Sequence, residues 1–170
     1  MPQTRHWVLL GLMSVGALLD QGSKWLAKTQ LNPLQPWPVI PHVFQLTLSY
    51  NTGAAFSMFN KQPQLLKGFT LLLFLGLLWY GWRKTVSSQW ETIAMGLILG
   101  GALGNLLDRI LQGRVTDFLD VVAIHYPIFN LADSLIFIGV WWLIILYLRQ
   151  PNRSCNASSP ACAPPTDASS

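Results

Sequence analysis

The sequence predicts an all-α membrane protein with four transmembrane helices and a small extracytoplasmic, amphipathic β-like platform between the first two. Of its 170 residues, 51% are hydrophobic and only 11% are charged, whereas soluble domains carry about 25% charged residues. Four apolar stretches each approach the roughly 20 residues that a bilayer core requires. Lys and Arg stand at the ends of these stretches, and the eight Trp and four Tyr suit the membrane interface.

The charge pattern argues against a nucleic-acid-binding protein. The net charge is +4, but Lys and Arg are scattered and form neither a basic stripe nor a recognition motif. Cys155 and Cys162 lie near the C-terminus, and His6, His42 and His125 are far apart in the chain, so no zinc or haem motif is present. We therefore expect no metal and no other cofactor.

The first span is expected from about Trp7 to Ala27. The start of the chain resembles a signal peptide, with an apolar run after Arg5. However, Asp20 and Lys24 stand where a cleavage site of small residues would be. The segment is therefore predicted to be a retained helix.

Three further spans are expected, from about Leu65 to Trp82, Thr92 to Leu111 and Leu131 to Leu148. Residues 1–150 then form a single four-helix domain. Residues 151–170 are rich in Ser, Ala, Pro and Asn, which predicts a disordered low-complexity tail.

The region between the first two spans has the pattern of a strand. Apolar and polar residues alternate from Phe44 to Tyr50, the period of a half-buried strand. Asn51-Thr52-Gly53 offers a turn, and Ala54-Ala55-Phe56 resumes an apolar run. Prolines before the strand exclude a helix there. The alternative to a platform is an ordinary extracytoplasmic loop.

Four spans place both termini on one side of the membrane. Lys and Arg are almost evenly divided between the two sides, so the positive-inside rule alone does not decide the orientation. If Lys24 and Arg109 are paired with neighbouring aspartates and are discounted, the termini are expected in the cytoplasm.

Five of the seven carboxylates fall on the side opposite the termini: Asp20, Asp108, Asp117, Asp120 and Asp133. An ionisable group at membrane depth costs about 2.5–3.5 kcal/mol on insertion scales and is by default a functional hypothesis. Two neighbouring carboxylates are sufficient to activate water without a metal, and Asp117 and Asp133 are the pair that the loop and helix-start contexts favour.

The third span carries a stripe of small residues at four-residue spacing, Gly96, Gly100 and Gly104. Such a stripe lets a second helix approach closely, and packing alone is sufficient to explain it. Asp108 is the next position of the stripe, with Asn105 beside it. This polar end of the helix is expected to face a partner helix and not lipid. Asp108 could pair with Arg109 or Arg114 and only shape a site, which is an architectural alternative to a direct function.

Asp20 and Lys24 stand at positions i and i+4 of the first helix, in the favourable order for an ion pair. The pair is either structural or a contact for a substrate headgroup or backbone.

Asp117 and Asp133 each have a structural explanation besides catalysis. Asp117, with Asp120 three residues on, has the pattern of a helix start. Asn130 fits an N-cap, with Asp133 at the third helical position, where the helix dipole favours a carboxylate. Neither explanation accounts for the gathering of acids in a chain that has so few.

These segments together resemble the lipoprotein signal peptidase family, signal peptidase II. The matching stretches are Asp20–Lys24, Asn51–Ser57, Gly100–Arg109, Val115–Phe118 and Phe129–Ser134. They occur in the family's order, and no motif position departs from the pattern. The tail after Arg149 lies outside it.

The resemblance implies an aspartic endopeptidase of the bacterial inner membrane that cuts prolipoproteins just before the diacylglyceryl-modified cysteine. Its catalytic dyad falls on Asp117 and Asp133. Its supporting polar residues fall on Asp20, Lys24, Asn51, Asn105, Asp108, Arg109 and Asn130. The resemblance further implies no metal, sensitivity to the cyclic peptide globomycin and contact with membrane lipid, and we expect a monomer.

Two other classes of protein are alternatives to this interpretation. A transporter or proton-coupled channel uses intramembrane acids as an ion path, but here the acids gather on one face and the second and fourth spans hold no midspan charge. A non-enzymatic assembly subunit would use the glycine stripe as its contact face. Loss of proteolysis on changing one aspartate would exclude both.

Overall fold

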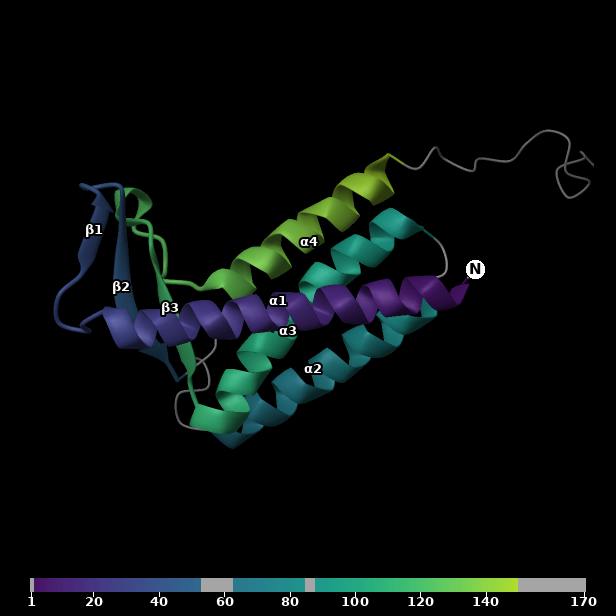
Figure 1. Ribbon diagram of the computed structural model, residues 1–170, viewed down its shortest axis with the longest axis horizontal. Helices are drawn as coiled ribbons and strands as arrows, with labels where there is room; N and C mark the ends of the chain where they lie inside the picture. The colour runs from purple at the N-terminus through teal and green to yellow at the C-terminus, as the bar shows by residue number, and fades with distance from the viewer. Residues whose placement is uncertain (1, 53–62, 85–87, 150–170) are drawn as a thin grey trace, which may run out of the picture.

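The computed structural model describes residues 2–52, 63–84 and 88–149. Along the chain the elements are α1 (Pro2–Gln30), β1 (Trp37–Ile40), β2 (Phe44–Asn51), α2 (Pro63–Lys84), α3 (Gln89–Gln112), β3 (Val115–Asp120), the short 3-10 helix η2 (Val122–Ile124) and α4 (Leu131–Leu148) (Figure 1). The expected segment Ala54-Ala55-Phe56 and the tail of residues 151–170, with its two cysteines, lie outside the described residues.

The four expected spans all fall within helices. Three described segments are long and apolar enough to cross a membrane: residues 64–83, 89–112 and 131–148. Helix α1 is the longest, at 29 residues, but it is more polar because it carries Arg5, Asp20, Lys24 and Lys28. The apolar-stretch reading is thus confirmed for α2, α3 and α4.

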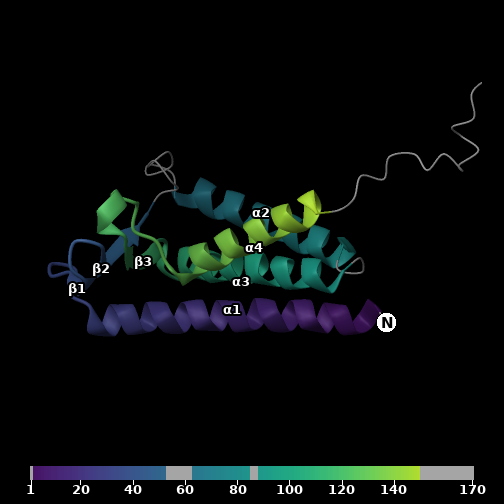
Figure 2. The ribbon, with the colours of Figure 1, turned by 90° about the horizontal axis from the view of Figure 1, so that it is seen from above.

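Helix α3 is the central element of the helical part. Figure 2 shows α1 along one side of α3 and α2 and α4 on the other. The predicted glycine stripe faces α1, because a Cβ on Gly96 would meet Leu12 and one on Gly104 would meet Asp20. A Cβ on Gly100 would lie 3.1 Å from the Cα of Gly16. Small residues therefore set the spacing between α1 and α3.

An antiparallel sheet in the order β1-β2-β3 lies at the end of the helices opposite the N-terminus (Figure 1). This confirms the expected strand from Phe44 to Tyr50. The sheet, however, is not built only from the segment between α1 and α2, because β3 follows α3. Gly113 makes this possible: with φ at 73° it ends α3 in the left-handed conformation, and β3 begins two residues later.

The alternative reading of Asp117 and Asp120 as a helix start is wrong, since both residues belong to β3. A buried cluster of Ala27, Leu48 and Phe118 packs the sheet onto the end of α1. Each of the three comes from a different element, so the cluster fixes the sheet relative to the helices.

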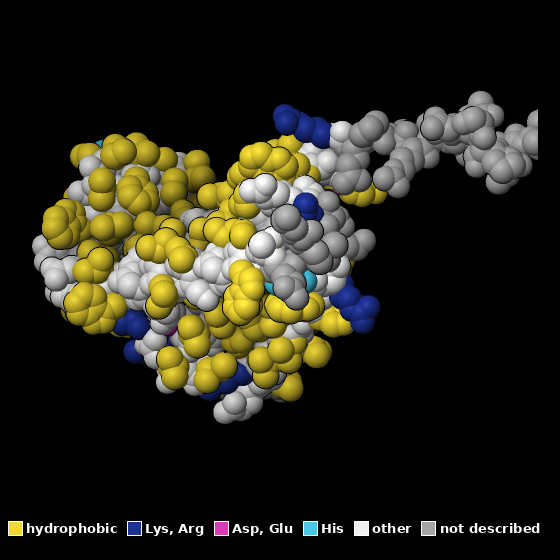
Figure 3. Space-filling view, turned by 45° about the vertical axis from the view of Figure 1, so that its right-hand side comes forward, with side chains coloured by type: hydrophobic (Ala, Val, Ile, Leu, Met, Phe, Trp, Pro, Cys, Tyr) yellow, Lys and Arg dark blue, Asp and Glu magenta, His cyan; other side chains and the backbone are white. Residues whose placement is uncertain are grey.

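The surface of the helices is apolar, and several charged side chains are buried. Large hydrophobic side chains such as Leu72 and Phe137 are 70% and 63% exposed, and hydrophobic side chains are spread over the face seen in Figure 3. Asp20, Lys24 and Asp108, by contrast, are fully buried. The interior thus combines an apolar core with a few buried charged groups, while the exterior is apolar enough to face lipid.

Candidate active site

The start of α4 brings two predicted residues together. Asn130 is the N-cap: its Oδ1 accepts a hydrogen bond from the backbone N–H of Asp133 at 3.0 Å, and its own backbone N–H donates to Oδ2 of Asp133 at 3.2 Å. The predicted capping role of Asp133 is therefore confirmed. It uses only one carboxylate oxygen, because Oδ1 of Asp133 accepts from Nδ2 of Asn105 at 2.9 Å. The cap thus orients Asp133, but it involves only one of the two carboxylate oxygens.

Asp117 lies in β3 and is only 4% exposed. Its Oδ1 accepts a hydrogen bond of 2.6 Å from Nδ2 of Asn130, and the side chain of Asn51, at the end of β2, also hydrogen-bonds to it. Asn130 therefore contacts both carboxylates, Asp117 through its side chain and Asp133 through the cap.

The surroundings of Asp117 raise its pKa from 3.8 to about 6. Burial is the main cause, because it disfavours the charged carboxylate, and the negative charge of Asp133 raises the pKa further. The hydrogen bonds from Asn130 and Asn51 and the charge of Lys24 act in the opposite direction. A carboxyl group that keeps its proton up to a pH of about 6 is thus placed beside a second carboxylate.

A buried ion cluster centred on Lys24 is connected to Asp133 through Asn105. The Nζ of Lys24 lies 2.7 Å from Oδ2 of Asp20 and 3.3 Å from Oδ2 of Asp108, and it donates to Oδ1 of Asn105 at 2.9 Å. The predicted pair between Asp20 and Lys24 is confirmed. The expected pairing of Asp108 with Arg109 or Arg114 is not found: its ion-pair partner is Lys24, because the glycine stripe that leads to Asp108 faces α1.

The cluster also anchors two backbone segments. Oδ1 of Asp20 accepts the N–H of Ala132 in the first turn of α4 at 2.9 Å, and Oδ2 of Asp108 accepts the N–H of Thr116 in β3 at 2.9 Å. Ala132 precedes Asp133, and Thr116 precedes Asp117. The cluster therefore fixes the backbone next to each carboxylate of the pair.

The two arginines after Asp108 have different environments. Arg109 interacts electrostatically with Asp133, Asp117 and Asp108, and its Nη1 lies 3.4 Å from the carbonyl oxygen of Asn105. Arg114 instead lies over the ring of Tyr50, with its Cζ 3.7 Å from the ring centroid.

The structure thus gathers every residue singled out as catalytic or supporting: Asp20, Lys24, Asn51, Asn105, Asp108, Arg109, Asp117, Asn130 and Asp133. Sequence reasoning missed Gln21, whose Nε2 donates to the carbonyl of Gly104 at 3.0 Å and to Oδ1 of Asp108 at 3.3 Å. Its position next to Asp20 was the one sequence feature that could have pointed to it. The backbone N–H groups of Thr116 and Ala132 could not be identified from the type of side chain.

Asp120 stands apart from this network. It was grouped with the other aspartates, but its Oδ2 accepts hydrogen bonds from Gln45 and Thr47 of β2, at 2.7 and 3.0 Å. Among the described residues, no group of three or more His, Cys, Asp or Glu side chains is arranged to hold a metal ion.

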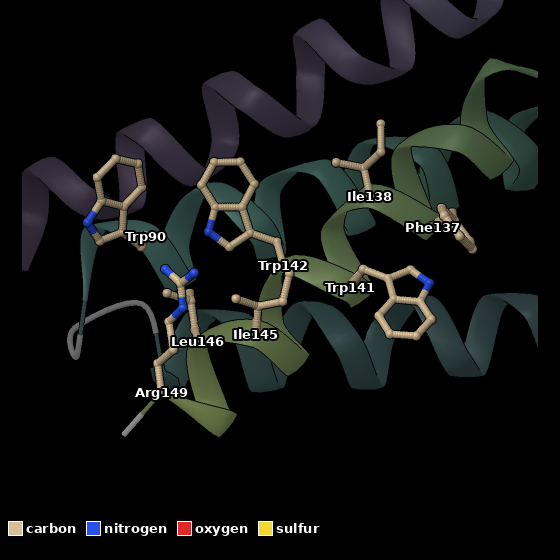
Figure 4. A pocket seen from close by; sticks show the side chains of 8 residues that line it. All are labelled: Trp90, Phe137, Ile138, Trp141, Trp142, Ile145, Leu146 and Arg149. Atoms are coloured by element: carbon tan, nitrogen blue, oxygen red, sulfur yellow. The ribbon is translucent and has the colours of Figure 1, made fainter. Parts of the chain in front are cut away.

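A cavity of about 660 Å³ runs along α4 toward its C-terminal end, lined by Trp90, Phe137, Ile138, Trp141, Trp142, Ile145, Leu146 and Arg149 (Figure 4). Two of these side chains, Trp90 and Trp142, stack with their ring centroids 5.8 Å apart. The lining is almost wholly apolar and includes none of the carboxylates. The cavity is therefore separate from Asp117 and Asp133, which lie at the sheet end of α4.

The chain is similar to proteins of one known family. A family model described as signal peptidase (SPase) II matches residues 12–149. A lipoprotein signal peptidase of Microcystis aeruginosa is 43% identical over 140 residues, which cover 82% of this chain and 90% of the relative. One of Solibacter usitatus is 35% identical over 168 residues, covering 93% of this chain and 100% of the relative.

Two solved structures of bacterial membrane enzymes, both obtained by the in meso method, are similar as well. The structure at 2.3 Å resolution has a TM-score of 0.75 and 28% identity, and the match covers 92% of this chain and 94% of that one. The structure at 1.9 Å has a TM-score of 0.70 and 29% identity, with coverages of 88% and 95%.

Proposed function

The chain belongs to the signal peptidase II family, and from this premise we propose that it removes signal peptides from diacylglyceryl-modified prolipoproteins, cutting just before the lipid-bearing cysteine. It is a membrane protease. The observation that carries the proposed aspartic mechanism is the contact of Asn130 with both Asp117 and Asp133, which holds a buried carboxyl group beside a second carboxylate.

In the proposed mechanism, Asp117 holds the proton that the pair shares. Its raised pKa supports this assignment. Asp133 accepts an N–H on each of its oxygens, an arrangement suited to a carboxylate, and it acts as the general base. The two side chains thereby take complementary roles at the same pH.

The reaction then proceeds without a covalent enzyme intermediate. Asp133 removes a proton from a water molecule, and the water oxygen attacks the scissile carbonyl carbon. The protonated Asp117 donates a hydrogen bond to the carbonyl oxygen as negative charge develops there. When the tetrahedral intermediate collapses, the C–N bond breaks and the leaving amine takes up a proton from the dyad.

The remaining predicted residues are proposed to hold the pair in position. Asn51 and Asn130 orient Asp117, and Asn105 orients Asp133. The buried cluster of Asp20, Lys24 and Asp108 fixes the backbone beside both carboxylates, and the positive charge of Arg109 balances part of the negative charge.

We propose that four helices span the membrane and that both termini lie in the cytoplasm. The N-terminus and the end of α4 lie at the same end of the bundle, and the carboxylates lie with the sheet at the other end (Figure 1). Lys24 pairs with two aspartates, so it is discounted in the positive-inside count. The site then faces the extracytoplasmic side, in one domain of residues 1–150 that acts as a monomer.

The test is cleavage of a diacylglyceryl-modified prolipoprotein by the purified protein in detergent, with the cut site read by mass spectrometry. We expect cleavage before the modified cysteine, resistance to EDTA and to serine-protease inhibitors, and inhibition by globomycin. The same precursor without the lipid serves as the substrate control. Well-folded protein that leaves the modified precursor intact would overturn the proposed function.

A further inference from the structure

The pairing of β2 with β3 contains an irregularity that decides which side chains of β2 face Asp117. Leu46 pairs with Leu119, but it is Ser49, and not Leu48, that pairs with Asp117. One extra residue of β2 is therefore accommodated between Leu46 and Ser49. Since successive strand side chains alternate between faces, this shift exchanges the two faces of the remaining strand.

The shift places Asn51 on the same face as Asp117. Asn51 pairs with Val115, two residues from Asp117, so the side chains of Asn51 and Asp117 project from one face of the sheet. Without the extra residue, Tyr50 would pair with Val115 and Asn51 would point to the opposite face. The hydrogen bond between Asn51 and Asp117 therefore depends on the bulge.

A single carboxylate oxygen ties the bulge to β3. Oδ2 of Asp120 accepts from Nε2 of Gln45, which precedes the bulge, at 2.7 Å, and from Oγ1 of Thr47, which lies within it, at 3.0 Å. Hydrogen bonds to an ionised acceptor are stronger than those between neutral groups. At the other end of the bulged segment, Arg114 stacks on Tyr50, the residue before Asn51.

We propose that Asp120 is a positioning residue for the protease: it holds the bulge in β2, and through the bulge it keeps Asn51 in contact with Asp117. Asp120 acts through Asn51 and does not itself touch the reacting atoms. This inference rests on the proposed function, in which Asp117 belongs to the catalytic pair.

The first variants are Asp120→Ala, which removes both hydrogen bonds, and Asp120→Asn, which keeps an oxygen able to accept them. Asp120→Ala is expected to lower kcat by about 10- to 100-fold, the cost of a small misplacement of a catalytic group, with little change in KM. Asp120→Asn is expected to restore most of kcat.

Thr70→Val and Glu91→Gln, which alter groups on α2 and at the start of α3, are the controls and should match wild type in kcat and KM.

A change in pH dependence separates positioning from simple loss of stability. Asp117 is influenced by Asp133 from α4, Lys24 from α1 and Arg109 from α3, and none of these is altered by the variant. The hydrogen bond from Asn51 lowers the pKa of Asp117. Its loss in Asp120→Ala should therefore move the limb of the kcat/KM profile that Asp117 controls to higher pH.

A double-variant cycle gives the deciding result. If Asp120 acts through Asn51, adding Asp120→Ala to Asn51→Ala causes little further loss, whereas independent effects would multiply. Multiplying effects, or an unshifted pH profile in Asp120→Ala, would overturn the inference. If Asp120→Ala fails to fold, Thr47→Val takes its place in the double-variant cycle with Asn51→Ala. This variant removes one of the two hydrogen bonds to Asp120 at nearly constant side-chain volume. An inactive wild-type protein would instead contradict the proposed function.

Discussion

At the scale of single residues, Asn130 explains how two acids share a confined site. It caps α4 through Asp133 and donates to Asp117, so the helix start and the strand are joined at the proposed reacting groups. The sequence identified the cap correctly. It did not identify the partner of Asp108, because that partner, Lys24, comes from a helix more than 80 residues earlier.

The pH dependence of catalysis follows from the pKa of Asp117. Burial, and after it the charge of Asp133, raises this pKa to about 6, which describes loss of the second proton from the pair. The form with one proton is therefore lost as the pH rises through about 6, and kcat/KM should fall by up to tenfold per pH unit above it. A pH–rate profile of the detergent-solubilised protein measures this. A kcat/KM that increases through this range would show that Asp117 works as the ionised base.

The ion cluster should make a large contribution to stability. Lys24→Met leaves the fully buried Asp20 and Asp108 without their cation, and breaking such an arrangement costs about 3–5 kcal/mol. Thermal unfolding in detergent should show a strongly lowered Tm. Lys28→Met is the matched control one turn away, where the ammonium donates a hydrogen bond to Gln112 and has no ion-pair partner among the described residues. Equal Tm values for the two variants would contradict a structural role for the cluster.

At the scale of elements, the length of the apolar stretches predicted the helices, and alternation of apolar and polar residues predicted the strand β2, because each has a local signal. Neither pattern predicted that residues 115–120 pair with β2. An acid followed three residues later by another acid fits a helix start, and only the turn at Gly113 and the pairing with β2 select the strand. Pairing between strands that are distant in the chain leaves little signal in the local sequence.

The contact between α1 and α3 depends on the absence of side chains. Gly100→Ala would place a Cβ 3.1 Å from the backbone of Gly16, and such overpacking costs about 1–3 kcal/mol. Gly11→Ala, on α1 with nothing within 4 Å of the added Cβ, should instead be neutral or stabilising. Thermal unfolding compares the two variants. A Gly100→Ala protein as stable as Gly11→Ala would show that the helices do not need this close approach.

At the scale of the whole molecule, composition alone indicated the membrane, and the apolar exterior of the structure agrees with it. Orientation could not be settled from the sequence, since the basic residues divide almost evenly. The structure adds one observation that favours the proposed orientation: Lys24 is enclosed in an ion cluster and is not available as a surface anchor.

Labelling with a membrane-impermeant thiol reagent tests this orientation. Cys155 and Cys162, near the C-terminus, should react only after the inner membrane is permeabilised. In a chain lacking both cysteines, His42→Cys, at the exposed turn between β1 and β2, should react in intact cells. Labelling of the native cysteines in intact cells would reverse the proposed orientation.

The central claim is that Asp117 and Asp133 together activate water, and the most direct measurement is turnover of the lipid-modified precursor by Asp117→Asn and Asp133→Asn. Each variant should lose at least about a thousandfold in kcat, since the two groups act as a unit, while its circular dichroism and Tm stay close to those of wild type. Glu91→Gln is the matched control for removing one carboxylate. Substantial turnover by either folded dyad variant would contradict the account.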